Sequence, residues 1–289
     1  MWLFLVLFCL SGLVIIGFYW KKSLPVPNST QPQIVDTKPP GPSISLETNP
    51  PPRQPFNYFL VLDVEATCVE GTDLTWPNEI IEWPVVLLTW DDRDEEGHAS
   101  KLKVVDEFRS YLNPSAFTDI DAAPTFPVVL ESCRTFLIRN GLICPKTGDR
   151  LNTFAWVTDG PFDIRDFVIK QCFISKITLP EWLQGDVIDS RKHVYECLGQ
   201  RKHGRRNHLS LNLTRQLSAL SLPPFEGRQH SGIDDTRNIA RILIELARRK
   251  VKLVPNLRIH TNRRWYWMGT EIGQIVEAYF PESLSVNIH

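Results

Sequence analysis

The sequence predicts an α/β fold in which helices flank a mixed sheet, preceded by an N-terminal transmembrane helix. Three observations carry this prediction. Residues 1–20 are apolar and free of charge, three strand-like segments follow between residues 58 and 112, and beyond them helix-like and short strand-like segments alternate. With 289 residues, 43% of them hydrophobic, the chain can bury a core of ordinary size.

The N-terminal stretch predicts a membrane anchor. About 20 apolar residues are what a helix needs to cross a bilayer, and here they are followed by Lys21 and Lys22. The stretch has no basic start and no small-residue cleavage site, so we expect an uncleaved, single-pass anchor over residues 1–20 rather than a signal peptide. The lysines place the following domain in the cytosol, whereas a cleaved signal would direct it to the lumen of the secretory pathway.

Composition divides the rest of the chain. Residues 23–55 are rich in Pro, Ser, Thr and Gln, which predicts a disordered linker between the anchor (1–22) and a folded domain (56–252), itself followed by a C-terminal extension (253–289). The six cysteines form no Cys-x-x-Cys pair, so free thiols in a reducing compartment are expected. A net charge of -1 leaves the partner open, since a nucleic-acid enzyme needs only a local basic surface.

The folded domain is expected to begin with strands and continue with alternating elements. Apolar runs with turn signals between them predict strands at residues 58–62, 79–90, 103–112, 152–157 and 186–188. Helical apolar spacing, with Gly141 as a stop signal for the first helix, predicts helices at residues 127–140, 162–173, 190–198, 210–220 and 235–250.

Paired acids at the end of the first strand suggest metal chemistry. Asp63 and Glu65 are two residues apart, so on a strand they share a face, and two like charges side by side favour a divalent cation between them. Two solvated acids at a strand end are the simpler alternative. Further acids occur downstream in two blocks where a strand or loop gives way to a helix, Thr158 to Asp163 and His230 to Asp235.

Together these blocks resemble the DEDDh 3′-5′ exonucleases, and within them the Eri-type exoribonucleases, which trim histone mRNA ends, ribosomal RNA ends and small interfering RNAs. The resemblance extends from about residue 56 to about residue 250 and implies a ribonuclease-H-like fold. Its matching segments are residues 62–68, where Val64 replaces the usual Phe, 79–84, 158–163 and 230–240.

The resemblance implies an active site. Two Mg²⁺ or Mn²⁺ ions would be held by four carboxylates, those of Asp63, Glu65, Asp159 and Asp235. Glu65 is also expected to be a catalytic residue. His230 lies in a Gly-containing loop and suits a general base that takes a proton from water, although a surface histidine in a turn is the alternative. The neighbouring acids Asp163 and Asp234 are expected to cap helix starts.

Basic residues are expected to contact RNA phosphates. Arg237 lies nearest the metal acids in sequence, and the others form a basic loop that could also be merely solvated: Arg201, Lys202, Arg205 and Arg206. The aromatic and arginine cluster at residues 262–267 could stack on bases, but we expect it to pack against the domain.

The expected function is that of a membrane-tethered, metal-dependent 3′-5′ exoribonuclease acting on single-stranded RNA 3′ ends, including structured RNA with an overhang. A DNA exonuclease with the same site is an alternative. A second alternative is a catalytically impaired RNA-binding or scaffold protein, because the chain passes from Leu112 to Pro127 without the Cys and Leu-Thr-Gly-Ile motif that lines the family's nucleotide site.

Overall fold

The computed structural model describes residues 50–68, 74–114, 123–199 and 211–276. The chain divides into two units, Met1–Pro50 and Pro51–His289, and the fold described below is that of the second. Residues 1–49, 115–122 and 200–210 lie outside the described residues, and so do the expected anchor and most of the expected linker. The segment that lacks the Leu-Thr-Gly-Ile motif also lies partly outside them.

A mixed sheet organises the domain, as predicted. In the described part of the chain it has six strands, in the order β2-β3-β1-β5-β6 with β4 also paired to β3. Strand β1 is antiparallel to β3 and parallel to β5, so it is hydrogen-bonded along both edges. The strands are β1 (Tyr58–Leu62), β2 (Glu65–Ala66), β3 (Ile80–Trp90), β4 (Leu102–Tyr111), β5 (Phe154–Thr158) and β6 (Ile188–Asp189).

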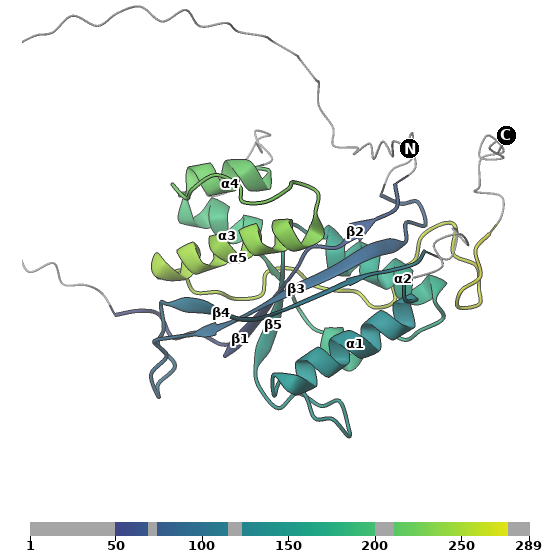
Figure 1. Ribbon diagram of the computed structural model, residues 1–289, viewed down its shortest axis with the longest axis horizontal. Coiled ribbons are helices and arrows are strands. Elements are labelled where there is room, and N and C mark those ends of the chain that lie inside the picture. The colour runs from purple at the N-terminus through teal and green to yellow at the C-terminus, as the bar shows by residue number, and fades with distance from the viewer. Residues whose placement is uncertain (1–49, 69–73, 115–122, 200–210, 277–289) are drawn as a thin grey trace, which may run out of the picture. The chain divides into compact units, whose positions relative to one another are not determined.

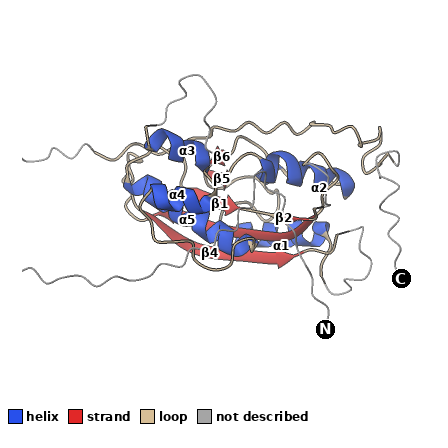
Figure 2. Cartoon of the chain, turned by 90° about the horizontal axis from the view of Figure 1, so that it is seen from above, coloured by secondary structure: helices blue, strands red, loops and turns tan. Residues whose placement is uncertain are grey.

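Helices cover both faces of this sheet (Figure 1). One group, seen together in Figure 2, comprises α3 (Ser190–Cys197), α4 (Leu213–Ala219) and α5 (Gly232–Arg248). The other face carries α1 (Phe126–Arg139), η1 (Asp163–Val168) and α2 (Ile169–Ile174), with the short turn η2 (Glu181–Leu183).

The side chains of β1 alternate between two hydrophobic cores, one on each face of the sheet. Leu60 and Leu62 belong to the core under α1 and α2, whereas Phe59 and Val61 belong to the core under α5, and all four are fully buried. A strand with apolar residues on both faces must be covered twice, which is why helices flank the sheet on both sides.

Most element boundaries shift by one to three residues from the predicted ones, and three differences bear on the site. Helix α5 begins at Gly232 rather than residue 235, because the backbone N–H groups at its start find partners elsewhere in the sheet. The expected helix at 162–173 is π-helical over η1 before it becomes α2. The two-residue strand β2, which carries Glu65, was not predicted because its pairing with β3 is irregular and short.

The segment after residue 252 is built into the domain. Backbone bonds join Val187 to Leu257, and Asn256 donates to and accepts from Asp189 at the end of β6. Trp267 is fully buried, and its indole N–H donates to the Thr75 carbonyl. The two tryptophans of this segment therefore pack against the domain, as expected, whereas Tyr266 between them is largely exposed.

The membrane prediction requires correction. No helix among the described residues combines the length and the apolar character needed to cross a bilayer. The longest of them, α5, has 17 residues and carries acids and arginines, whereas a span needs about 20 apolar residues. This finding overturns the expected fold with a transmembrane helix, and with it the single-pass, membrane-anchored localisation.

Candidate metal centre

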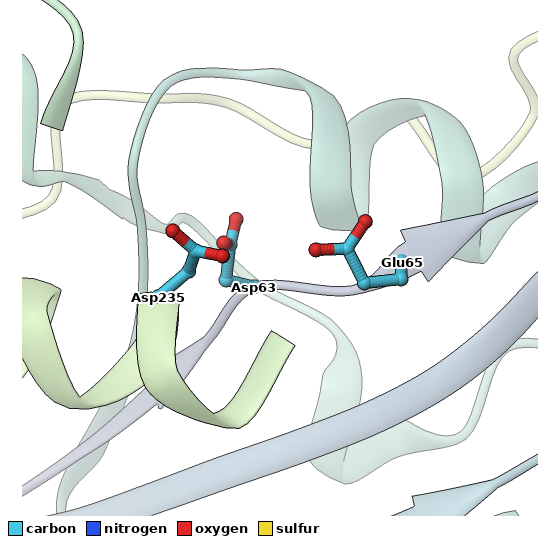
Figure 3. Close-up of side chains that lie close together, drawn as sticks. All are labelled: Asp63, Glu65 and Asp235. Atoms are coloured by element: carbon cyan, nitrogen blue, oxygen red, sulfur yellow. The ribbon is translucent and has the colours of Figure 1, made fainter. Parts of the chain in front are cut away.

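Three carboxylates meet where the central strand ends. Asp63 follows β1, Glu65 lies on β2, and Asp235 lies in the first turn of α5. One carboxylate oxygen from each lies within 4.8 Å of the others. Figure 3 shows the Asp63 and Asp235 carboxylates next to each other, with Glu65 facing them from the adjoining strand.

The carboxylates hold their protons unusually tightly in this setting. Removal from water, and then the charges of Asp235 and Glu82, raise the pKa of Glu65 to about 8. Burial likewise raises the pKa of Asp235 to about 6, although the backbone N–H groups of His230 and Ser231 offset part of the effect. Burial and then the charge of Asp163 raise the pKa of Asp63 well above its usual value. The positive charge near the cluster, such as that of Arg228, is therefore too small to offset its carboxylates.

A divalent cation fits this donor set. Oδ2 of Asp235 is buried and has no hydrogen-bond partner among the described residues, although buried carboxylate oxygens ordinarily have one. Hard cations such as Mg²⁺ and Mn²⁺ prefer carboxylate oxygens, and their charge would reverse the repulsion among these acids. The residues present are therefore suited to hold such an ion.

Asp159, expected in the metal set, is engaged elsewhere. Its Oδ2 accepts a 2.7 Å bond from the Arg191 guanidinium, and its Oδ1 accepts a 2.7 Å bond from the Gln216 amide. Its side chain is 10% exposed and does not belong to the three-carboxylate group. The structure thus shows Asp159 as a link between the end of β5 and helices α3 and α4.

Asp163, four residues later, lies closer to the centre. It is the first residue of η1 and is 5% exposed. Its Oδ1 accepts a 3.0 Å bond from the N–H of Val64, the residue between the two acids of the first motif. Burial raises the pKa of Asp163 to about 7, and among neighbouring charges it has the largest effect on Asp63.

Sequence reasoning assigned Asp163 the role of a helix cap. The start of η1 shows no side-chain capping bond. The spacing of the Thr158 to Asp163 block does not by itself distinguish its two acids, but Asp159 directly follows β5 whereas Asp163 is the first residue of η1. The usable signal was the position of Asp163 at the first helical residue, where a side chain can point back at the strand ends.

His230 lies in the loop that leads into α5. It has a positive φ of 62°, is exposed, and its pKa is lowered by partial burial. The loop is held by Asp234, whose Oδ2 accepts a 3.0 Å bond from the Arg228 N–H. A Cβ at Gly227 would lie 2.5 Å from the Asp234 carboxyl carbon, so this turn requires glycine. Asp234 therefore shapes the His230 loop instead of capping α5.

Of the five residues expected to contact RNA, the structure describes one, Arg237. Arg201, Lys202, Arg205 and Arg206 lie outside the described residues. Arg237 is described, and its guanidinium binds Glu107 of β4 at 2.6 Å and Asp234 at 3.4 Å. The structure therefore places Arg237 in a bridge between α5 and the sheet, with half of its side chain exposed.

The chain matches no protein-family model. It is 30% identical over 258 residues to "3'-5' exonuclease eri1" of Schizosaccharomyces pombe, a match that covers 78% of this chain and 77% of that protein. It is 26% identical over 223 residues to human "3'-5' exoribonuclease 1", covering 72% of this chain. The chain spans 57% of the length of that human protein.

Solved structures agree with this result. The nuclease domain of 3'hExo, described as a DEDDh family member bound to rAMP, superposes with a TM-score of 0.58 at 27% identity, covering 71% of this chain and 98% of that domain. A structure described as "3'-end specific recognition of histone mRNA stem-loop by 3'-exonuclease" has the same TM-score and identity, and covers 88% of that chain. The expected ribonuclease-H-like exonuclease fold is thereby confirmed.

Proposed function

The chain belongs to the Eri-type family of DEDDh 3′-5′ exoribonucleases, and from this premise we propose that it removes nucleotides from the 3′ ends of single-stranded RNA, including structured RNA with an overhang. Membership confirms the resemblance and the enzyme class predicted from the motifs. The RNA substrate is supported by the names of its relatives, which are exoribonucleases, and by the neighbouring structure with a histone mRNA stem-loop.

The observation that carries the proposal is the convergence of Asp63, Glu65 and Asp235 around a buried carboxylate oxygen without a partner. We propose that these three residues and Asp163 hold two Mg²⁺ or Mn²⁺ ions. Bound there, the ions would stabilise charge on the attacking and leaving oxygens of an in-line hydrolysis. Asp163 replaces Asp159 in this set because Arg191 and Gln216 already occupy both oxygens of Asp159.

The protein's own residues supply the proton transfer. His230 lies in the loop that leads into α5, five residues before Asp235, and its lowered pKa keeps the imidazole neutral near pH 7, so that it can take a proton from water. Its Nδ1 or Nε2 would accept this proton. We therefore propose His230 as the general base.

The test uses the full chain with 5′-labelled single-stranded RNA, with matched DNA, and with Mg²⁺, Mn²⁺ or chelator. We expect a metal-dependent ladder that shortens from the 3′ end, faster on RNA. It should be absent in Asp63→Asn, and His230→Ala should slow it by about 100- to 10,000-fold. Faster degradation of DNA would refute the RNA assignment, and RNA binding without cleavage by the folded wild-type protein would refute the proposed activity.

A further inference from the structure

The start of α5 is capped by another strand. Its own N-cap residue, Ser231, makes no side-chain capping bond. The first two backbone N–H groups of the helix instead donate to the carboxylate of Glu82 on β3, from Gly232 at 3.2 Å and from Ile233 at 3.1 Å. A carboxylate at a helix N-terminus is doubly favourable, because it accepts otherwise unpaired donors and opposes the helix dipole.

Glu82 is built into this position. It is 4% exposed, and Arg109 of β4 donates to its Oε1 at 2.8 Å. A buried carboxylate is costly unless it is paired and hydrogen-bonded, and here three donors satisfy it. With both oxygens engaged by protein groups, Glu82 is not available as a metal ligand.

Glu82 also adjoins the other half of the acidic centre. In the pairing of β2 with β3, Glu65 lies opposite Glu82. At Gly232, an added Cβ would lie 3.0 Å from the carbonyl oxygen of Asp63 and 3.2 Å from the Glu82 carboxyl carbon. Gly232 therefore lies against the backbone of Asp63. Its N–H donates to Glu82, which is the strand partner of Glu65.

We propose that Glu82 is a positioning residue that fixes α5, and with it Asp235 and the His230 loop, against Asp63 and Glu65. The inference rests on the proposed function of this centre and adds to it the part that sets its geometry. The three acids come from two separate parts of the chain, the segment from the end of β1 to β2 and the start of α5. Glu82 is hydrogen-bonded to α5 and paired with Glu65 of β2. Replacing Glu82 would therefore increase the distances between the metal-binding carboxylates without removing any of them.

The test compares Glu82→Gln with Glu245→Gln in the full chain. An amide at residue 82 has one acceptor oxygen, so its NH₂ group must face at least one of the N–H donors that now converge there. Glu245 lies near the C-terminal end of α5, opposite the end that Glu82 caps, where it binds Arg248 at 2.7 Å and Arg249 at 2.6 Å. The control therefore makes the same chemical change at the far end of α5, away from the acidic centre, with loss of two ion pairs.

We measure Mn²⁺ affinity by titration calorimetry, kcat and KM on labelled RNA, and thermal midpoints. Outer-shell partners of metal ligands typically contribute about 10- to 100-fold, so Glu82→Gln should weaken Mn²⁺ binding and lower kcat by that factor, with KM for RNA changed less than about threefold. Glu245→Gln should lower the thermal midpoint and change neither constant. A merely structural role of Glu82 would give the same pattern as this control.

Wild-type kcat and Mn²⁺ affinity in folded Glu82→Gln would overturn the proposal. If that variant does not fold, Gly232→Ala tests the same junction, because the added Cβ would lie 3.2 Å from the Glu82 carboxyl carbon and 3.0 Å from the Asp63 carbonyl oxygen. Unchanged constants there would overturn the proposal equally. A wild-type chain that binds Mn²⁺ but cleaves no RNA would refute the proposed function alone, and the Mn²⁺ titration would still decide the role of Glu82.

Discussion

The acidic centre should make the metal-free protein less stable as the pH rises. Glu65 has a pKa of about 8 in the folded chain against 4.5 for the isolated side chain, so the folded state binds its proton more tightly. Stability from this group is fully present below pH 4.5 and is lost as the pH rises through 8. At about 1.4 kcal/mol per pKa unit, the difference corresponds to roughly 5 kcal/mol.

Glu65 is only half-buried, so solvent screens part of this energy, and we take about 3 kcal/mol as the loss. For a domain of this size, that lowers the thermal midpoint by about 6–12 °C. His230, with its lowered pKa, opposes the trend only below about pH 6.5. Mn²⁺ at 100 times its Kd should restore about 2.7 kcal/mol at pH 8.

The assay is thermal unfolding in chelator at pH 5, 6.5 and 8, for the wild-type chain and for Asp63→Asn. Removing one charge from the cluster should lower the remaining pKa values, so the variant should lose less stability across this range and should exceed the wild type at pH 8. It should also gain less from Mn²⁺. A wild-type midpoint that stays level or rises from pH 5 to pH 8 in chelator, in parallel with the variant, would refute the reasoning.

Three further predictions follow from the described contacts. Asp163→Asn should lower kcat more than about 100-fold in the RNA ladder assay, whereas Asp159→Asn should lower the thermal midpoint and retain most activity; the reverse order would restore Asp159 to the metal set. A chain ending at Lys252 should show no cooperative unfolding by circular dichroism, whereas one ending at Val276 should fold, and equal folding of both would contradict the packing of this segment. Fully buried Lys170 donates to Leu74 and Trp76 carbonyls and to Asn78, so Lys170→Met should cost about 2–4 kcal/mol in denaturant unfolding, and a cost below about 1 kcal/mol would contradict that role.

Local sequence patterns predicted most of the sheet and its helices because the residues of each element are contiguous. The same is true of Asp63 and Glu65, whose shared face follows from the period of a strand, and of Asp235 at a helix start. The choice between Asp159 and Asp163 was not local. It depends on Arg191 and Gln216, which lie 32 and 57 residues beyond Asp159.

The membrane prediction was wrong, whereas the domain boundary at residue 252 stays a prediction; both were drawn from local patterns. The membrane-anchored fold was predicted from hydropathy and the lysines that follow the apolar stretch, and no helix of the described residues bears it out. The boundary at residue 252 was drawn where the family motifs end, but Leu253 is fully buried and its N–H donates to Gln54, 199 residues earlier. We propose that the folded domain extends to about residue 276.

The double pairing of β1 has a consequence for how the centre can fail. A strand hydrogen-bonded along both edges exposes its amides only when the whole domain opens, so the amides of Leu60 and Val61 should be among the slowest to exchange with deuterium. Asp63 is attached to this most protected part of the molecule. Asp235 is attached to a helix end and His230 to a loop, which open at lower cost. When the acidic centre loses its arrangement, Asp235 and the His230 loop should therefore move first, while β1 keeps Asp63 in place.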